Sequence, residues 1–598
     1  MKTKTSVILT LFLALAVQLS FAQEKEITGT VSDQDGVPLV GVNIFEKDTS
    51  NGTQSDFDGN YKLDIETGKT IVFSSIGYKT IEQTVGDTNS INITMEEEAS
   101  ALEEVVITAL GVKRKQEDIT YANEVVKGDQ VNQAANSNAI QALAGKVSGL
   151  QINTTGSGVN PNKSIILRGF SSISGGNSAL VVIDDVISTT TTLNNIDPNS
   201  IESVNVLKGP VGAALYGSRA GNGVIIVTTK KGNKGGKLIV DLKSTLSLET
   251  ILFLPQRQDR FGQGWEGDLD WTDQGAWGPE FDGSNQVVGI PYPTASDWRF
   301  ARYEHIEDHI KPFFDTGIEK QQSISLSAGN SEGYGNFSYN FVETEGLIPG
   351  DRRTRNFFNF SAGKTLGKFS IKGIARYTTT KSNLVTGNTY ANLSQTPTNI
   401  DVTQFSSGDN TDNWTLYARS PYWNLINSRS IGDNARFEGN LDLGYNINDN
   451  INVILRSSVN TTRGEGSAYN NDFVDTNIYQ FTDRSIVSSY SSTRSGFQQL
   501  YTDLLTNLNY DLSENISFNG LVGYNMTATK SNSGTISGTE LTIPGLYHIG
   551  NAAELNDPTE TRSVLRGQSI FASAEFGYKN YLTLLVTGRN DWFSQLSK

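Results

Sequence analysis

Apolar and polar residues alternate along much of the second half of the chain. Ile324, Leu326 and Ala328 alternate with serines, and residues 516–524 repeat the same pattern. Successive side chains of a strand point to opposite faces, so a period of two predicts strands with one apolar and one polar face. Between residues 236 and 598 the pattern predicts about 11 long strands.

The links between these strands alternate between short and long, and only the link at residues 344–352 breaks the contrast. Residues 446–450 and 511–515 are short links, whereas residues 383–433 and 533–560 are long ones. Long strands joined in this way are typical of outer-membrane barrels, and large transporters of that kind have about 22 strands around a plugged lumen. The pattern therefore predicts about half of a 22-stranded antiparallel transmembrane β-barrel, in a chain that stops before the closing strand.

The first half of the chain has a different pattern of apolar and turn-forming residues. Short β-branched segments separated by Gly, Asp and Asn turns predict a small β-sandwich before residue 98. The acidic stretch that follows leads into Val105–Gly111, an extended segment for which we expect no partner strand. Next comes a mixed region with a helix-like segment at 139–147 and strands expected at 164–167, 179–183, 201–207 and 224–229. This region predicts a small α+β domain, so the fold class is mainly β.

The amino terminus has the features of an export signal. Lys2 and Lys4 precede an apolar run, and Ser20-Phe21-Ala22 fits the small-residue cleavage pattern. The run is shorter than the roughly 20 residues of a spanning helix. We expect a signal peptide over 1–22, the sandwich over 23–98, a linker over 99–115, the α+β domain over 116–235 and the barrel strands over 236–598.

Composition narrows the function. The formal charge of −16 argues against nucleic-acid binding, and the absence of Cys excludes disulfides and thiolate metal sites. His305 and His309 stand four residues apart, but no Glu occupies the place that the zinc-protease motif requires, so a surface helix is expected there. Asp268, Asp270 and Asp273 match a calcium loop only in part. We therefore expect no cofactor and no metal site, and keep calcium as a candidate only.

Several motifs resemble known families. Gly29–Asp33, Pro38–Asn43 and Asp58–Tyr61 resemble the carboxypeptidase-regulatory-like domain. Ile201–Lys208 and Ala213–Gly232 nearly reproduce the plug signature of the SusC/RagA family of TonB-dependent outer-membrane transporters. Residues 587–592, Thr-Gly-Arg-Asn-Asp-Trp, also fit this family. The plug positions singled out by the resemblance are Arg168, Gly169, Lys208, Tyr216, Gly217, Arg219, Asn222 and Gly223.

The chain departs from the family pattern at two places. Asp185 stands where the family usually has Gly, and Gly209-Pro210 replaces an Asp-Ala type pair.

The resemblance implies that residues 116–235 form a plug and that a TonB box precedes it. A TonB box adds as a strand to TonB, and such strand addition uses extended, β-branched residues. The alternative is an ordinary linker strand docked on its neighbours. The expected box consists of Glu104, Val105, Val106, Ile107, Thr108 and Ala109.

In the plug, Arg168, Lys208 and Arg219 are candidates to pair with carboxylates that line the barrel, because buried charges need partners. The alternative for each of them is a solvated position in a plug loop.

The resemblance also implies a function. The family imports large nutrients actively across the outer membrane, which implies TonB, a SusD-like surface lipoprotein, outer-membrane lipid and a glycan or peptide substrate as partners, with no enzymatic reaction. Trp265, Trp271 and Trp277 lie on a long loop where they are candidates for substrate contact, although loop packing is the commoner role of such residues. The alternatives are an adhesin or structural barrel, and a secreted carboxypeptidase, for which no catalytic domain is visible.

Overall fold

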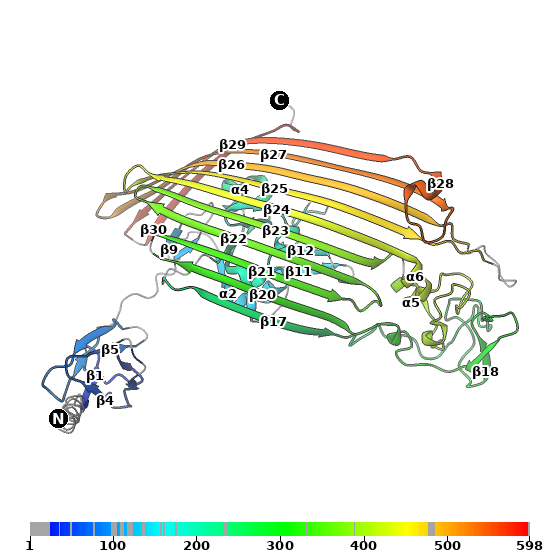
Figure 1. Ribbon diagram of the computed structural model, residues 1–598, viewed down its shortest axis with the longest axis horizontal. Helices are drawn as coiled ribbons and strands as arrows, with labels where there is room; N and C mark the ends of the chain where they lie inside the picture. The colour runs from blue at the N-terminus through cyan, green and yellow to red at the C-terminus, as the bar shows by residue number, and fades with distance from the viewer. Residues whose placement is uncertain are drawn as a thin grey trace, which may run out of the picture. The chain divides into compact units, whose positions relative to one another are not determined.

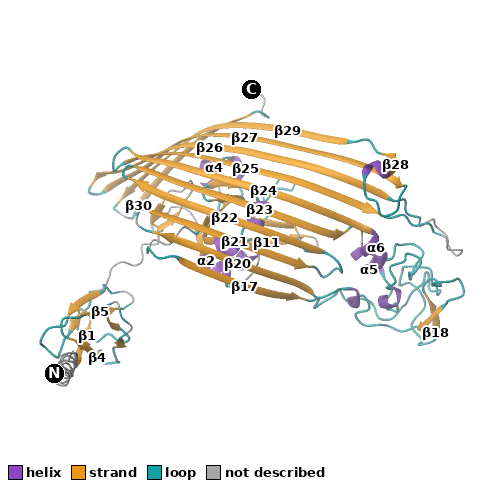
Figure 2. Ribbon diagram, viewed as in Figure 1, coloured by secondary structure: helices purple, strands orange, loops and turns teal. Residues whose placement is uncertain are grey.

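The structure is a computed structural model that describes residues 24–595, except 35, 48, 50, 76–77, 97–104, 108–112, 116–122, 134–137, 156–157, 160–161, 174–175, 210, 231–235, 331, 388, 476–484 and 580. Strands dominate it (Figure 2). The chain divides into two compact units, residues 1–105 and 106–598. Within the described residues no helix combines the length and the apolarity that crossing a bilayer requires.

The first unit contains two sheets that share one core. One sheet has the order β4-β1-β7 and the other β3-β2-β5-β6. Ile27, Ile44, Leu63 and Phe73 pack together from both sheets, which confirms the β-sandwich. Its strands are β1 (Glu24–Ser32), β2 (Asn43–Glu46), β3 (Gly52–Gln54), β4 (Asn60–Glu66), β5 (Thr70–Ser74), β6 (Ile81–Thr84) and β7 (Ile93–Thr94).

Two short strands, β8 (Val105–Ile107) at the boundary between the units and β9 (Lys113–Lys115), pair with each other. The expectation that the segment after residue 104 has no partner strand is therefore wrong. Two short strands can pair when a short connection joins them. The pattern of apolar residues within one segment does not show whether such a partner strand follows.

The plug region follows and centres on a mixed five-stranded sheet of order β10-β15-β16-β13-β14. A separate hairpin, β11–β12, packs beside it. The strands are β10 (Asn123–Lys127), β11 (Leu150–Thr155), β12 (Asn162–Leu167), β13 (Leu180–Ile183), β14 (Val186–Ser188), β15 (Ile201–Leu207) and β16 (Val224–Thr229). The helices are α2 (Gly128–Asn132), α3 (Thr190–Asn195) and α4 (Val211–Tyr216), with 3₁₀ turns η3 (Gln141–Leu143), η4 (Pro198–Ser200) and η5 (Ser218–Ala220).

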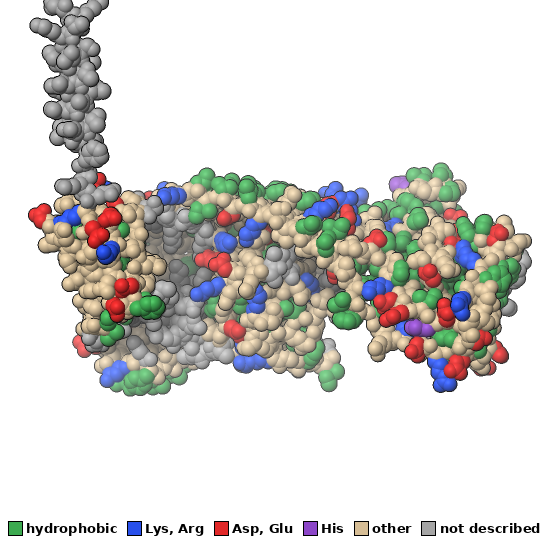
Figure 3. Space-filling model, turned by 90° about the horizontal axis from the view of Figure 1, so that it is seen from below, with side chains coloured by type: hydrophobic (Ala, Val, Ile, Leu, Met, Phe, Trp, Pro, Cys, Tyr) green, Lys and Arg blue, Asp and Glu red, His purple; other side chains and the backbone are tan. Residues whose placement is uncertain are grey.

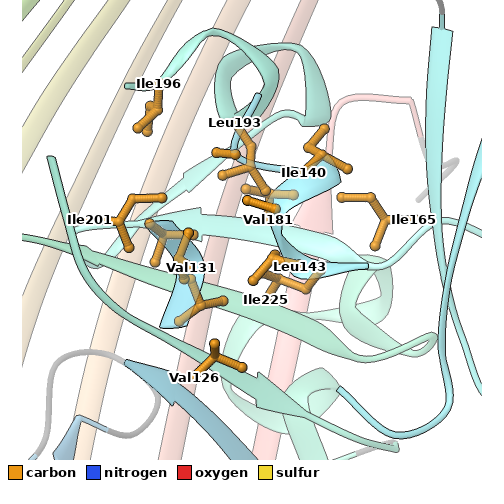
Figure 4. Close-up of a cluster of buried hydrophobic side chains, with 14 of the residues drawn as sticks. Val126, Val131, Ile140, Leu143, Ile165, Val181, Leu193, Ile196, Ile201 and Ile225 are labelled. Carbon is orange, nitrogen blue, oxygen red and sulfur yellow. The ribbon is translucent and has the colours of Figure 1, made fainter. Parts of the chain in front are cut away.

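The helix expected over residues 139–147 is wrong. Only the 3₁₀ turn η3 forms there, and Gly145 and Gly149 both have positive φ, which ends helical geometry. Ile140, Leu143 and Val147 are nevertheless buried in the plug core, part of which Figure 4 shows. The apolar spacing that suggested a helix therefore reflects successive turns that face the same core.

A twelve-stranded antiparallel sheet makes up the rest of the second unit (Figure 1). Eleven strands follow one another along the path β17-β20-β21-β22-β23-β24-β25-β26-β27-β29-β30, and β28 pairs beside β27. This confirms the predicted fold class, including the long antiparallel strands. The strands are β17 (Ile239–Glu249), β20 (Gly317–Gly329), β21 (Gly333–Glu345), β22 (Arg352–Leu366), β23 (Phe369–Val385), β24 (Ser428–Asn446), β25 (Ile451–Asn470), β26 (Ser489–Ser513), β27 (Ile516–Leu541), β28 (Ala552–Leu555), β29 (Thr559–Tyr578) and β30 (Leu582–Phe593).

The links between these strands are short at one end of the sheet and long at the other, except that the β21–β22 link at the long-loop end is only residues 346–351. β24 and β25 are separated by residues 447–450, whereas residues 386–427 separate β23 from β24. The strands next to the long loops run to 25 residues in β26 and 26 in β27. They are therefore longer than the roughly 9–11 residues that crossing a bilayer takes, so they extend beyond it at the loop end.

Two long loops fold together into a lobe, which we call the loop lobe and define as residues 250–316 and 386–427. Val288, Ile310, Leu393 and Trp414 share its core. Figure 3 shows acidic, basic and apolar side chains intermingled over this end of the sheet. The lobe contains β18 (Asn285–Val288), β19 (Arg299–Arg302), α5 (Thr389–Gln395), α6 (Pro421–Asn427), η6 (Lys311–Phe313) and η7 (Val402–Phe405), and a later loop contains η8 (Ile549–Asn551).

The outward face of the large sheet carries rows of aromatic side chains. Midway along the strands, Tyr339 stacks on Phe358 at a ring distance of 4.7 Å, and Tyr377 and Phe437 continue the row across β23 and β24. Near the short turns, Phe369 lies 4.6 Å from Tyr445 and Phe518 lies 5.1 Å from Phe576. Between the rows the outward residues of β24, such as Leu441 and Leu443, are apolar, as expected of a surface that faces lipid.

Candidate functional site: the plug against the concave face of the sheet

The plug elements lie against the concave face of the large sheet (Figure 1), and its central sheet is buried on both faces. Along β16 all six residues are buried. Ile225 and Val227 point into a core made almost entirely by the plug, whereas Val224 and Ile226 point into a second core. Burial on both faces explains why residues 224–227 of β16 are all apolar and do not alternate.

The second core joins the plug to the large sheet. Leu180, Leu207 and Tyr216 of the plug pack in it with Tyr501 of β26 and Phe571 of β29. Tyr216 is only 2% exposed. Each large side chain buried in such a core contributes about 1.5–3 kcal/mol relative to exposure. The plug is thus fixed to β26–β29 by apolar packing as well as by polar contacts.

One residue of the plug signature, Gly217, lies against the motif at residues 587–592. A side chain at Gly217 would come within 3.3 Å of the Arg589 guanidinium and of the Asp591 carboxylate, and φ at Gly217 is +84°. Both the close approach and the backbone geometry therefore require glycine. Two motifs that lie about 370 residues apart in sequence thus form one contact between plug and sheet.

The remaining signature residues organise the plug itself. Asn222 accepts a hydrogen bond from Ser171 Oγ at 2.7 Å and donates one to the Gly176 carbonyl at 2.8 Å. Gly223 (φ +97°) leaves no room for a side chain, which would lie 2.9 Å from the Leu207 carbonyl oxygen. Gly169 also has a positive φ of 87°.

The basic signature residues do not pair with the barrel as expected. Lys208 Nζ lies 2.5 Å from Glu124 Oε2 and 2.7 Å from Ser148 Oγ, so its partners belong to the plug. Arg168 and Arg219 are exposed, and neither forms an ion pair with the described part of the chain. Burial raises the pKa of Glu124, but the hydrogen bonds from Lys208 and Ser148 outweigh it and leave the pKa of this carboxyl below its usual range.

In the charged contact between plug and sheet, the plug supplies the carboxylates and the sheet supplies the cations, the reverse of what was expected. Ile183 pairs with Val186, so Asp184 and Asp185 form the two-residue turn between β13 and β14. Their φ angles are +48° and +72°. Positive φ at both positions is the type I′ geometry, which favours Asn-Gly and strains other residues. The plug thus presents two adjacent carboxylates from a strained turn.

Asp184 contacts both its own domain and the sheet. Its carboxylate accepts hydrogen bonds from Thr229 N and Thr229 Oγ1, both at 2.9 Å, and pairs with the Arg376 guanidinium of β23. Arg376 also lies 3.8 Å from Glu438. The side chains of Asp184 and Arg376 are only 3% and 7% exposed, so each needs its partner.

Asp185 joins a second cluster on the sheet. Its carboxylate lies 3.3 Å from Arg456 Nη2 and 3.9 Å from Lys372 Nζ. Asp442 of β24 approaches the same two cations at 3.1 and 3.8 Å. Two carboxylates and two cations therefore compensate one another, and Arg456 keeps a carboxylate partner even without the plug.

The other expected contact residues stand as follows. Val105–Ile107 of the TonB-box segment form β8, whereas Glu104, Thr108 and Ala109 lie outside the described residues. In the loop lobe Trp265 and Trp277 stack at 5.2 Å and are 52% and 65% exposed, and Trp271 meets Trp298 edge-on at 5.0 Å. Their role in substrate contact stays a prediction.

The surface helix expected around His305 and His309 is wrong. These residues form a turn in which Asp308 has a φ of +53°, and His309 is only 4% exposed with Nε2 3.1 Å from the Thr396 carbonyl oxygen. Burial lowers the pKa of His309.

At the calcium-like sequence, the Asp270 carboxylate accepts from Thr272 N at 2.8 Å. Among the described residues no group of three or more His, Cys, Asp or Glu is arranged to hold a metal ion.

The comparisons with known proteins agree with this architecture. Residues 27–107 match the CarboxypepD_reg-like domain and residues 115–224 match the TonB-dependent Receptor Plug Domain. The TonB-dependent receptor P39 of Formosa agariphila is 26% identical over 99% of this chain and 55% of its own length. The TonB-dependent receptor SusC of Bacteroides thetaiotaomicron is 27% identical over 83% of this chain and 48% of its own.

A solved structure of the RagAB peptide importer in its open-open state has a similar fold, with a TM-score of 0.66 and 17% identity over 82% of this chain and 56% of that one. The plug and the large antiparallel sheet have the architecture of TonB-dependent receptors. The chain is similar to this family, including SusC, and spans about half the length of the curated relatives it matches.

Proposed function

We propose that the protein imports a large nutrient across the outer membrane, using energy delivered through TonB. The observation that carries this proposal is the plug, which is bound to the concave face of long antiparallel strands by a shared apolar core and by the Asp184–Asp185 turn. A passive pore needs no such plug. An adhesin has no use for a domain fixed behind its strands, so energised import explains the arrangement better.

The proposed cycle requires no covalent chemistry and no cofactor. The substrate binds at the long-loop end, TonB pairs with the strand at Glu104–Ala109, and force on that segment moves the plug. Strand addition to TonB would need the main-chain groups of β8, one side of which already pairs with β9. Engagement of TonB on that side therefore requires the β8–β9 pairing to open.

The substrate is proposed to be an oligosaccharide or an oligopeptide. The family resemblance supports both, and the similarity to SusC and to a peptide importer does not separate them. The exposed faces of Trp265 and Trp277 suit the stacking of sugar rings or peptide side chains. A SusD-like surface lipoprotein is the proposed partner at the loop end, on the same resemblance.

The deciding experiment is uptake of labelled oligosaccharides and oligopeptides by cells that produce the protein, the protein with Glu104–Ala109 deleted, or the Val106→Pro variant. Proline removes a main-chain N–H and so blocks strand pairing, whereas the control Val106→Thr keeps a β-branched residue. Energised import predicts that the deletion and Val106→Pro abolish uptake while the control retains it, with equal amounts of protein in the outer membrane. Uptake that survives the deletion would contradict the TonB-box assignment and favour a passive or adhesive role.

A further inference from the structure

The outward face of the large sheet contains a groove that the proposed transport does not use. It has a volume of about 890 Å³ and lies over β26, β27, β29 and β30. Leu500, Met526 and Trp592 line it, and each side chain is about half exposed, at 48%, 47% and 51%. Three large apolar side chains around an open groove form a surface suited to a hydrocarbon chain.

Basic side chains stand at the loop end of this groove. Arg566 of β29 is part of its lining. Ala528 of β27 is the direct partner of Arg566 in the ladder, and Lys530 lies two residues further along the same face. Diagonal neighbours of this kind lie about 7–8 Å apart, within reach of one another's long side chains. In the described part of the chain no acidic partner is recorded for either cation.

Arg566 and Lys530 differ from the other charged residues nearby, which form ion pairs. Arg562 pairs with Glu560 at 2.6 Å on the same face. Asp591 also belongs to the lining, but its carboxylate faces the plug and pairs with Arg589 at 2.7 Å. Arg566 and Lys530 thus form a local positive site on a protein whose formal charge is −16.

The position of the groove adds a further constraint. Towards the short turns the outward residues of β29 are apolar from Ile570 to Phe576, whereas towards the long loops they include Arg562 and Glu560. Trp592 and Arg566 therefore stand where an apolar outward face changes to a charged one. Aromatic and basic side chains are enriched at this level, where lipid headgroups begin.

We propose that this groove binds a phosphorylated lipid of the surrounding outer leaflet, with an acyl chain along Leu500, Met526 and Trp592 and a phosphate between Arg566 and Lys530. Guanidinium and ammonium groups are the side chains that bind phosphate best, and the arginine can do so with two parallel hydrogen bonds. The inference rests on the proposed function only in placing this face in the outer membrane.

The test measures lipid binding to the purified protein in a non-ionic detergent by native mass spectrometry. The probes are lipid A, the same lipid with its phosphates removed, and inorganic phosphate. The double variant Arg566→Gln/Lys530→Gln is expected to bind lipid A about tenfold more weakly, because it loses charge-assisted hydrogen bonds. Arg463→Gln on β25, a cation that also pairs with a carboxylate (Glu465) but lies outside the groove, is the matched control and is expected to bind as the wild type does.

A second variant tests the apolar part. Met526→Gln is expected to weaken the binding of lipid A and of its dephosphorylated form alike. Its preference for the phosphorylated lipid, which the double variant is expected to lose, should remain. Equal binding of lipid A by wild type and double variant would overturn the proposal. Equal binding of lipid A and its dephosphorylated form, or tight binding of inorganic phosphate alone, would overturn it as well.

This assay needs neither TonB nor a substrate, so its outcome is independent of the uptake experiment. A protein whose uptake depends on residues 104–109 but whose groove does not distinguish lipid A refutes the lipid site alone. A protein that binds lipid A as expected but takes up cargo without those residues refutes energised import alone.

Discussion

Asp184 and Asp185 are neighbours in one turn, yet their environments predict different consequences of substitution. Asp184→Ala removes the partner that lies closest to the buried Arg376 and leaves Glu438 at 3.8 Å. Breaking a buried ion pair from one side costs about 3–5 kcal/mol. Asp185→Gly removes one of two carboxylates beside Arg456, but it also relieves a non-glycine residue at φ +72°, which itself costs about 1–2 kcal/mol. The two effects oppose each other.

We therefore expect Asp184→Ala to release the plug at a clearly lower temperature, and Asp185→Gly to leave that temperature nearly unchanged. The measurement is proteolytic cleavage within the plug of the purified protein as temperature rises, with the barrel strands as the internal reference. Equal destabilisation by the two substitutions would show that the turn acts through its backbone and not through its separate ion pairs.

At the scale of single elements, the sequence predicted strands well because a strand buried on one side leaves a period of two. The stretch 516–524 has that period and lies within β27. The short helices α2, α3 and α4 have five or six residues each, too few for a helical period to show.

The polar contacts between plug and sheet could not be predicted from the sequence for another reason. Arg456 and Asp185 are 271 residues apart, and no pattern along either segment encodes which strand faces the turn. The one available signal was Asp185 itself, an acidic residue where the family usually has glycine.

The loop lobe carries a pH-dependent element. Burial lowers the pKa of His309, so the folded lobe holds this imidazole neutral, whereas the unfolded segment takes up a proton near pH 6.5. His309 therefore adds no penalty above that pH, and the lobe loses stability as pH falls through and below 6.5. The protection of residues 305–313 against hydrogen exchange, taken relative to the intrinsic exchange rate at each pH, is expected to fall as the pH is lowered from 7.5 to 5.5.

Substitutions at the two histidines separate this effect from a general one. His309→Gln is expected to flatten the pH dependence of exchange, and His305→Gln, at an exposed position, is expected to leave it as in the wild type. A pH dependence that persists unchanged in His309→Gln would assign it to other groups.

At the scale of the whole molecule, the direction of the sheet in the membrane follows from its links. All long loops leave one end of the sheet, which also has the short link 346–351, and the other end has short turns alone; outer-membrane barrels place long loops outside the cell. The chain has no Cys, so a single introduced cysteine reports its own position without background. Gln404 lies in the loop lobe, Glu514 lies in the short turn between β26 and β27, and Val522 lies on the outward apolar face of β27.

A membrane-impermeant maleimide applied to intact cells is expected to label Gln404→Cys and to leave Glu514→Cys unlabelled until the outer membrane is opened. Val522→Cys is expected to resist labelling in both conditions and to react only after denaturation, because lipid covers its side chain. The unsubstituted protein provides the blank. Labelling of Glu514→Cys on intact cells would reverse the orientation, which would place the plug's amino-terminal segment outside the reach of TonB. Rapid labelling of Val522→Cys would mean that water and not lipid covers this face, and the lipid site at Arg566 and Lys530 would fall with it.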